Sequence, residues 1–108
     1  MPDFSLLPEG FWLPLAADEA ASRLAELYRE AIPGHLLYGV LLQALADACD
    51  NDDVLFQHLE NPERFTVAHL TGCGGPEIDV HHPTIEFDGT WAEFVVDQQR
   101  LLDWLRAN

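Results

Sequence analysis

A helical pattern of apolar positions begins near Asp18 and continues towards the Pro33-Gly34 pair. Apolar residues recur every three or four positions while charged residues fill the opposite face, as in an amphipathic helix. The apolar positions are Ala20, Ala21, Leu24, Leu27, Tyr28 and Ala31. Asp18 is the predicted N-cap, and proline followed by glycine is a helix stop. We therefore predict an N-terminal helix over this stretch.

A second helical pattern covers the C-terminal part of the chain. Thr90 and Glu93 have the spacing of a capping box, in which each side chain accepts a hydrogen bond from the backbone N–H of the other residue. Gln98 interrupts an apolar stripe that is expected to face the core. The stripe consists of Trp91, Phe94, Val95, Leu101, Leu102 and Leu105.

Two shorter segments have the composition and patterning of strands. In the first segment, successive side chains alternate between two faces, so Phe65, Val67 and His69 share one face. The second covers residues 84–87, between a proline and an Asp-Gly pair. We predict a strand at each.

Residues 38–49 support two interpretations. Their leucine and alanine content favours a helix by propensity. The turn-type cluster at residues 50–53, followed by an apolar run that begins at Val54, favours instead a strand that forms a hairpin with residues 54–59. The pattern of this stretch leaves both alternatives open.

The first 16 residues contain three prolines among aromatic and aliphatic side chains. Proline fixes φ and removes a backbone donor, so residues 1–16 are predicted as an extended arm that lies on the core. The elements together indicate one α+β domain over residues 1–108. In it, a small antiparallel sheet of three to four strands packs in two layers against an N-terminal and a C-terminal helix.

The chain carries 5 basic and 19 acidic residues, which gives a formal net charge of −14, while its 48% hydrophobic content is that of a folded domain. Such a surface repels nucleic acids and anionic membranes and attracts cationic proteins. Five scattered arginines cannot build a basic stripe for nucleic acid. No apolar run approaches the roughly 18–20 residues of a membrane span. We expect neither nucleic acid nor membrane as a partner.

The N-terminus lacks the basic and apolar regions of a secretory signal, which predicts a cytoplasmic protein. Cys49 and Cys73 are expected to remain free thiols in that reducing compartment. The sequence contains no phosphate-binding glycine loop, and no cofactor is predicted.

Four acidic residues cluster near the middle of the chain, at Asp47, Asp50, Asp52 and Asp53. They do not form a calcium-binding EF-hand loop. Such a loop needs a ligand, a glycine and a glutamate at positions that Val54 and later residues occupy in this sequence. One interpretation is a solvated turn. The other is a partner-binding surface that steers a basic protein, to which an exposed Trp104 near the chain end is expected to contribute.

The residues with the chemistry of a zinc site are His69, Cys73, Asp79 and His81. A related hypothesis makes Cys73 a nucleophile that His69 or His81 activates. The structural alternative is that His69 is hydrogen-bonded in the core, that His81 and His82 lie in a surface loop, and that Cys73 is an incidental loop thiol. None of the spacings matches a known ligand set.

Four short blocks occur in a fixed order along the chain: Asp52 to Phe56, Val67 to Thr71, His82-Pro83 and Trp91 to Phe94. In this order of blocks the sequence resembles a group of small uncharacterised bacterial proteins. The resemblance implies a strand over residues 40–48, and it implies no activity.

Three function hypotheses follow. The first is a non-enzymatic domain that binds a basic protein, for example an immunity or inhibitor protein of a cationic toxin. The second is a small metal-binding protein or enzyme that uses the region from His69 to His82. The third is a homo-oligomeric structural or regulatory subunit such as a homodimer. A negative surface that serves solubility only is the alternative to all three.

Overall fold

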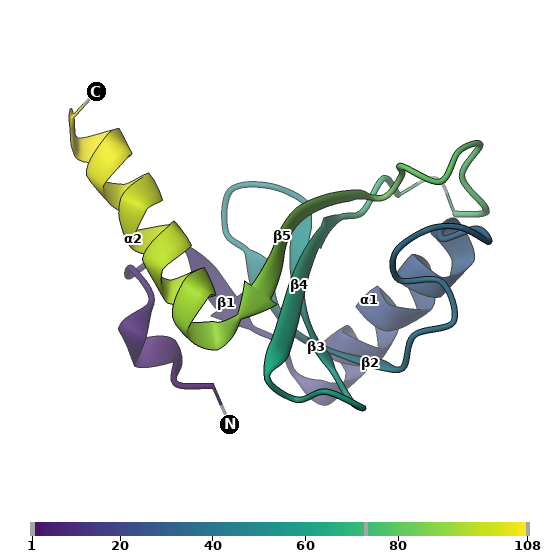
Figure 1. The fold of residues 1–108 in the computed structure, drawn as a ribbon, viewed down its shortest axis with the longest axis horizontal. Helices are drawn as coiled ribbons and strands as arrows, with labels where there is room; N and C mark the ends of the chain where they lie inside the picture. Colours follow the sequence, from purple (N-terminus) through teal and green to yellow (C-terminus); the bar gives the residue numbers. More distant parts are fainter. Residues whose placement is uncertain (1, 73, 108) are drawn as a thin grey trace.

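A five-stranded antiparallel sheet runs through the middle of the molecule in the computed structural model, which describes residues 2–72 and 74–107 (Figure 1). The strands are adjacent in chain order and consist of β1 (Trp12–Pro14), β2 (Leu42–Ala48), β3 (Asp53–His58), β4 (Arg64–His69) and β5 (Thr84–Thr90). Helix α1 (Ala17–Glu30) connects β1 to β2, and helix α2 (Trp91–Ala107) follows β5.

The predicted α+β class and both helices are confirmed, but the sheet has five strands, not three to four. The additional strand is β1, which comes from the N-terminal arm and pairs with β2 from Trp12 to Pro14. An edge strand tolerates proline because the backbone positions on its outer side do not donate hydrogen bonds to another strand. The arm also contains a short 3-10 helix at Phe4–Leu6.

Residues 42–48 form a strand, so the helix alternative for this stretch was wrong. Pairing with β1 on one side and β3 on the other outweighs the helix propensity of leucine and alanine. The register shifts between Ala44 and Ala46, as at a β-bulge. Ala44 therefore packs into the core on one face of the sheet, and Ala46 packs into the core on the other.

The two helices cover opposite faces of the sheet (Figure 1), so the predicted two-layer arrangement was wrong. Leu27 of α1 packs with Val54 and Phe56 on one face, while Phe94 of α2 packs with Leu55 on the other. Val54, Leu55 and Phe56, three successive residues of β3, are therefore all buried, as expected for a strand that is covered on both sides.

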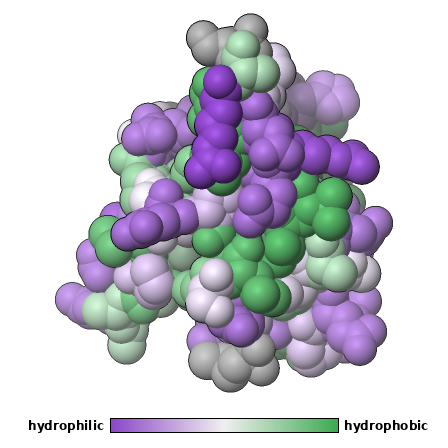
Figure 2. Space-filling view, turned by 90° about the vertical axis from the view of Figure 1, so that its left-hand side faces the viewer, coloured by the Kyte–Doolittle hydropathy of each residue, from purple (hydrophilic) through white to green (hydrophobic). Residues whose placement is uncertain are grey.

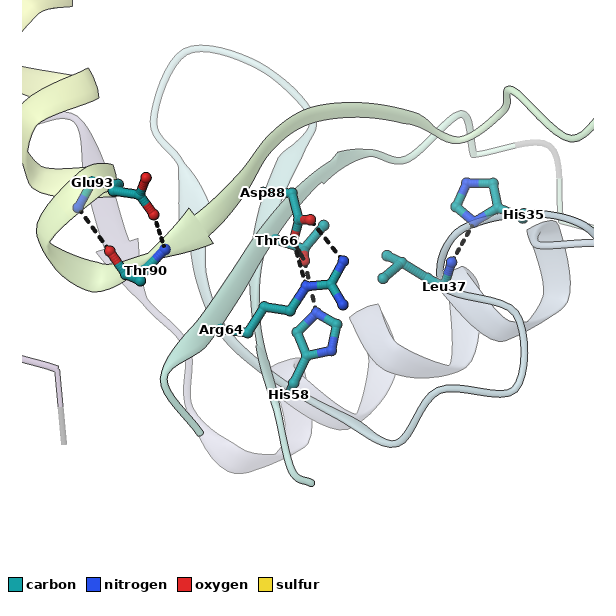
Figure 3. Close-up of polar contacts among 8 residues, drawn as sticks. All are labelled: His35, Leu37, His58, Arg64, Thr66, Asp88, Thr90 and Glu93. Carbon is teal, nitrogen blue, oxygen red and sulfur yellow. Dashed lines mark hydrogen bonds and ion pairs between the residues drawn. The ribbon is translucent and has the colours of Figure 1, made fainter. Parts of the chain in front are cut away.

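Both helices begin with a carboxylate that accepts a backbone hydrogen bond. The predicted capping box of α2 is confirmed, with Thr90 N to Glu93 Oε1 at 2.8 Å and Glu93 N to Thr90 Oγ1 at 3.2 Å (Figure 3). Helix α1 begins after Ala16, whose N–H donates to Glu19 Oε1 at 3.1 Å, so the prediction of Asp18 as N-cap was wrong. No helix within residues 2–72 and 74–107 is long and apolar enough to cross a membrane.

A buried carboxylate ties the connection between β4 and β5 to the end of α1. Glu30, the last residue of α1, has no exposed surface. Its Oε1 accepts from Thr71 N at 2.9 Å and its Oε2 accepts from Gly72 N at 3.0 Å. A negative charge is unfavourable at a helix C-terminus, so these two N–H groups are the interactions that stabilise it there.

We expect the Glu30→Gln variant to lose about 1–3 kcal/mol in the free energy of unfolding, because its amide NH₂ would face one of the two N–H donors and leave it unsatisfied. Urea denaturation of wild type and variant measures the difference. The exposed Glu60 supplies the control, since Glu60→Gln is expected to leave the midpoint nearly unchanged. Equal stability of Glu30→Gln and wild type would contradict the anchoring role.

Candidate functional site

The structure divides the acidic cluster of the sequence into two paired and two exposed members. Asp47 forms an ion pair with Arg23 of α1, with Nη2 to Oδ2 at 2.9 Å. Asp53 contacts His69 of β4 across the sheet, with Oδ1 to Nδ1 at 2.7 Å. Asp50 and Asp52 are exposed in the turn between β2 and β3. The solvated part of the predicted cluster is therefore this turn.

A hollow of about 110 Å³ lies between this turn and α2, and we refer to it as the α2 groove. One wall is acidic and polar, with Asp50, Asn51 and Asp53. The opposite wall is aromatic and aliphatic, and the full lining is Phe11, Trp12, Ala48, Asp50, Asn51, Asp53, Gln98, Leu101 and Leu105. A surface of this kind presents carboxylates and apolar area side by side.

The apolar wall exists because α2 extends past the sheet (Figure 1). Phe94 and Gln98 in its first half are buried, whereas Leu101 is 43% and Leu105 is 50% exposed, so placing these two leucines in the core was wrong. Gln98 is buried because its Oε1 accepts from Trp12 Nε1 at 2.7 Å. Figure 2 shows apolar surface surrounded by hydrophilic side chains on this side of the molecule.

Trp104 lies on the same outer half of α2 and is 61% exposed. It does not line the α2 groove. Of the residues that line the groove, the sequence pattern points to a partner surface only at Asp50 and Asp53, and not at apolar residues such as Phe11, Leu101 and Leu105. The apolar periodicity of a helix predicts that its leucines share one face. It does not predict where along the helix the sheet that packs against this face ends.

Among the described residues from His69 to His82, His69 does not share a group of potential metal ligands with Asp79 or His81. Asp79 Oδ1 accepts from His81 N at 2.8 Å and contacts His82 Nδ1 at 2.9 Å, and all three residues belong to an exposed loop. The hydrogen bond with His82 lowers the pKa of Asp79, and the same carboxylate raises the pKa of His82. Cys73 lies outside the described residues.

His69 has different neighbours from those predicted. Its side chain is 42% exposed at the end of β4, so the expectation of a core histidine was wrong. Asp53 of β3 and Glu86 of β5 each bring a carboxylate oxygen near it, and the three donor atoms lie within 4.8 Å of one another. Among residues 2–72 and 74–107, this is the group of three or more histidine, cysteine or carboxylate donors close enough to share an ion. It contains neither Asp79 nor His81.

A separate polar network connects β3, β4 and β5 (Figure 3). Arg64 makes a bidentate pair with Asp88, at 2.9 and 2.7 Å, and Thr66 Oγ1 donates to the same carboxylate at 2.7 Å. Because the Thr66 hydroxyl has one hydrogen, it accepts from Nε2–H of His58, at 2.8 Å. Burial, and secondarily Arg64, lowers the pKa of His58, while the hydrogen bond with Arg64 lowers the pKa of Asp88. Thr66 is fully buried and His58 nearly so, which makes the network a structural element.

The pH dependence of stability tests this network. Because the pKa of His58 is below its unfolded value of 6.5, His58 contributes stability that is complete above that pH and is lost as the pH falls towards the folded pKa. Between about pH 7.5 and about pH 5, we expect the melting temperature of wild type to fall more than that of His58→Gln, whose amide keeps a donor for Thr66. His82→Gln should change the slope in the opposite sense, because the pKa of His82 is raised. Parallel curves for wild type and His58→Gln would contradict this assignment.

The α2 groove brings acidic and apolar side chains together, and the donors around His69 lie close enough to share an ion. Comparison with known proteins adds no relative: no family model, no curated protein and no solved structure matches this chain.

Proposed function

We propose that this protein is a non-enzymatic binding domain for a basic protein partner and that the partner contacts the α2 groove. The observation that carries the proposal is the pairing of an acidic wall at the β2–β3 turn with an apolar wall on α2. An inhibitor of a cationic toxin is one concrete version of such a protein.

The groove has the chemistry to take a lysine or arginine side chain. These residues combine an aliphatic stem with a cationic end group. The stem would lie on Leu101, Leu105 and Phe11, and the cation would meet the carboxylate of Asp50 on the opposite wall. Small-molecule sites are usually about 300–1,000 Å³. A hollow of about 110 Å³ suits one side chain of a protein better than a cofactor.

The charge of the whole chain supports the same class of partner. A formal charge of −14 attracts a cationic protein over distances longer than any contact and raises its association rate. The same charge opposes a homodimer through this groove, because two equally negative surfaces would approach each other. Electrostatic attraction favours a cationic partner, and burial of apolar side chains then slows the dissociation of that partner.

The experiment compares variants that separate local contacts from net charge. Immobilised tag-free protein is used to capture partners from a lysate of its source at low salt, and the partner is then purified for affinity measurements. Asp50→Asn and Glu60→Gln each remove one exposed negative charge, but only Asp50 lines the groove. We expect Asp50→Asn to weaken binding about tenfold, mainly through the association rate, and Glu60→Gln to change it little.

The apolar wall is tested by the double variant Leu101→Ser and Leu105→Ser, which should weaken binding at least about tenfold through faster dissociation. Both side chains are largely exposed, so the fold should be retained, and circular dichroism checks this. Equal affinities of the wild type, Asp50→Asn and the double variant would contradict the groove as the contact surface. Retention of no protein at low salt would contradict the function itself.

A further inference from the structure

Three adjacent strands bring metal-binding side chains to one place at the end of the sheet. Asp53 begins β3 and is the cross-strand partner of His69, which ends β4. Both lie on the same face as Leu55 and Val67, which pack in the core cluster that includes α2. Glu86 of β5 completes the group, which we refer to as the Asp53–His69–Glu86 cluster.

A register shift brings Glu86 to this face. Val67 pairs with Phe87, but the next residue, Ala68, pairs with Ile85, which leaves Glu86 as the additional residue of a bulge. A bulge redirects a side chain that regular alternation would place elsewhere. The acidic side chain is therefore positioned by the backbone of a paired strand, which is more rigid than a loop.

Among the described residues, no arginine forms an ion pair with the carboxylates of the cluster. Two carboxylates share the site with one imidazole, and their donor atoms lie within 4.8 Å of one another. Asp53 has His69 as its partner at 2.7 Å, whereas the Glu86 carboxylate forms no side-chain hydrogen bond or ion pair with any residue in 2–72 or 74–107. A divalent cation between the three donors would neutralise both carboxylates.

We propose that the Asp53–His69–Glu86 cluster binds a divalent transition-metal ion, with zinc as the representative. Zinc accepts imidazole nitrogen and carboxylate oxygen together, whereas calcium and magnesium prefer oxygen ligands alone. Three protein ligands leave at least one coordination position for water. Asp53 also lines the α2 groove, whereas His69 and Glu86 do not, so the metal site goes beyond the proposed binding function.

The geometry needs only side-chain adjustment to hold the ion. Ligands at about 2.0–2.1 Å from a tetrahedral zinc stand roughly 3.3 Å apart. The distance of 2.7 Å between Asp53 Oδ1 and His69 Nδ1 must therefore lengthen slightly. Donor atoms of the cluster that lie up to 4.8 Å apart must move closer together. His69 and Glu86 are accessible to solvent, so both can rotate and an ion can enter. The negative field of the chain also concentrates cations at its surface.

Calorimetric titration of tag-free protein with zinc chloride, and absorption spectroscopy with cobalt(II), test the site in the presence of excess Mg²⁺. We expect one ion per chain, and we expect His69→Gln and Glu86→Gln each to weaken its binding at least about tenfold, because even partners outside the ligand shell are worth about 10–100-fold. The control is His82→Gln. It breaks another exposed histidine–aspartate contact, at 2.9 Å, to which the described residues add no third donor, and it should bind the ion like wild type.

Several results would overturn the proposal. These are the absence of saturable binding in wild type, displacement of the ion by Mg²⁺, wild-type affinity in Glu86→Gln, or an equal loss in His82→Gln. Glu86 is exposed, so its variant is expected to fold, and thermal unfolding without metal confirms this. Partner affinity of the Glu86→Gln variant is measured in parallel. If the Glu86→Gln variant loses metal binding but keeps its affinity for the partner, the metal site is supported and the α2 groove is neither supported nor contradicted.

Discussion

The central strands β3 and β4 must bury apolar side chains on both of their faces, and the rest of the structure depends on this constraint. Leu55 and Val67 need cover on one side, and Val54 and Phe56 need it on the other. One helix per face supplies that cover. Burial on both sides is the main favourable contribution available to a chain of this size, since a single face would leave half of each central strand in water.

This constraint also produces the candidate binding surface. Helix α2 is needed over the part of the sheet where Phe94 packs, and it continues past that part with leucines that are about half exposed. The β2–β3 turn approaches the same leucines with Asp50. The proposed recognition surface is therefore a consequence of where the sheet ends, and the overall negative charge is the basis for proposing a cationic partner.

Most buried polar side chains have a hydrogen-bond partner, with Trp91 Nε1 as the exception among the described residues. Glu30 has two backbone donors, and His58 is connected through Thr66 to Asp88. Exposed carboxylates lie on both helices, in the turns and at the open end of the sheet. The cluster that contains Glu86 belongs to this second class, and its accessibility is what allows an ion to reach it.

The sequence by itself determined both helices, the capping box at Thr90, the strand around Val67 and the negative surface, because periodicity, capping and charge depend on residues close together in the chain. Only the tertiary structure decided that residues 42–48 form a strand and that the helices take opposite faces, although the unbroken apolar run at β3 was a signal for the latter. It also decided that His69 meets Asp53 and Glu86, not Asp79. Cross-strand neighbours are set by register, and one additional residue in a bulge changes which side chains meet, which no local pattern encodes.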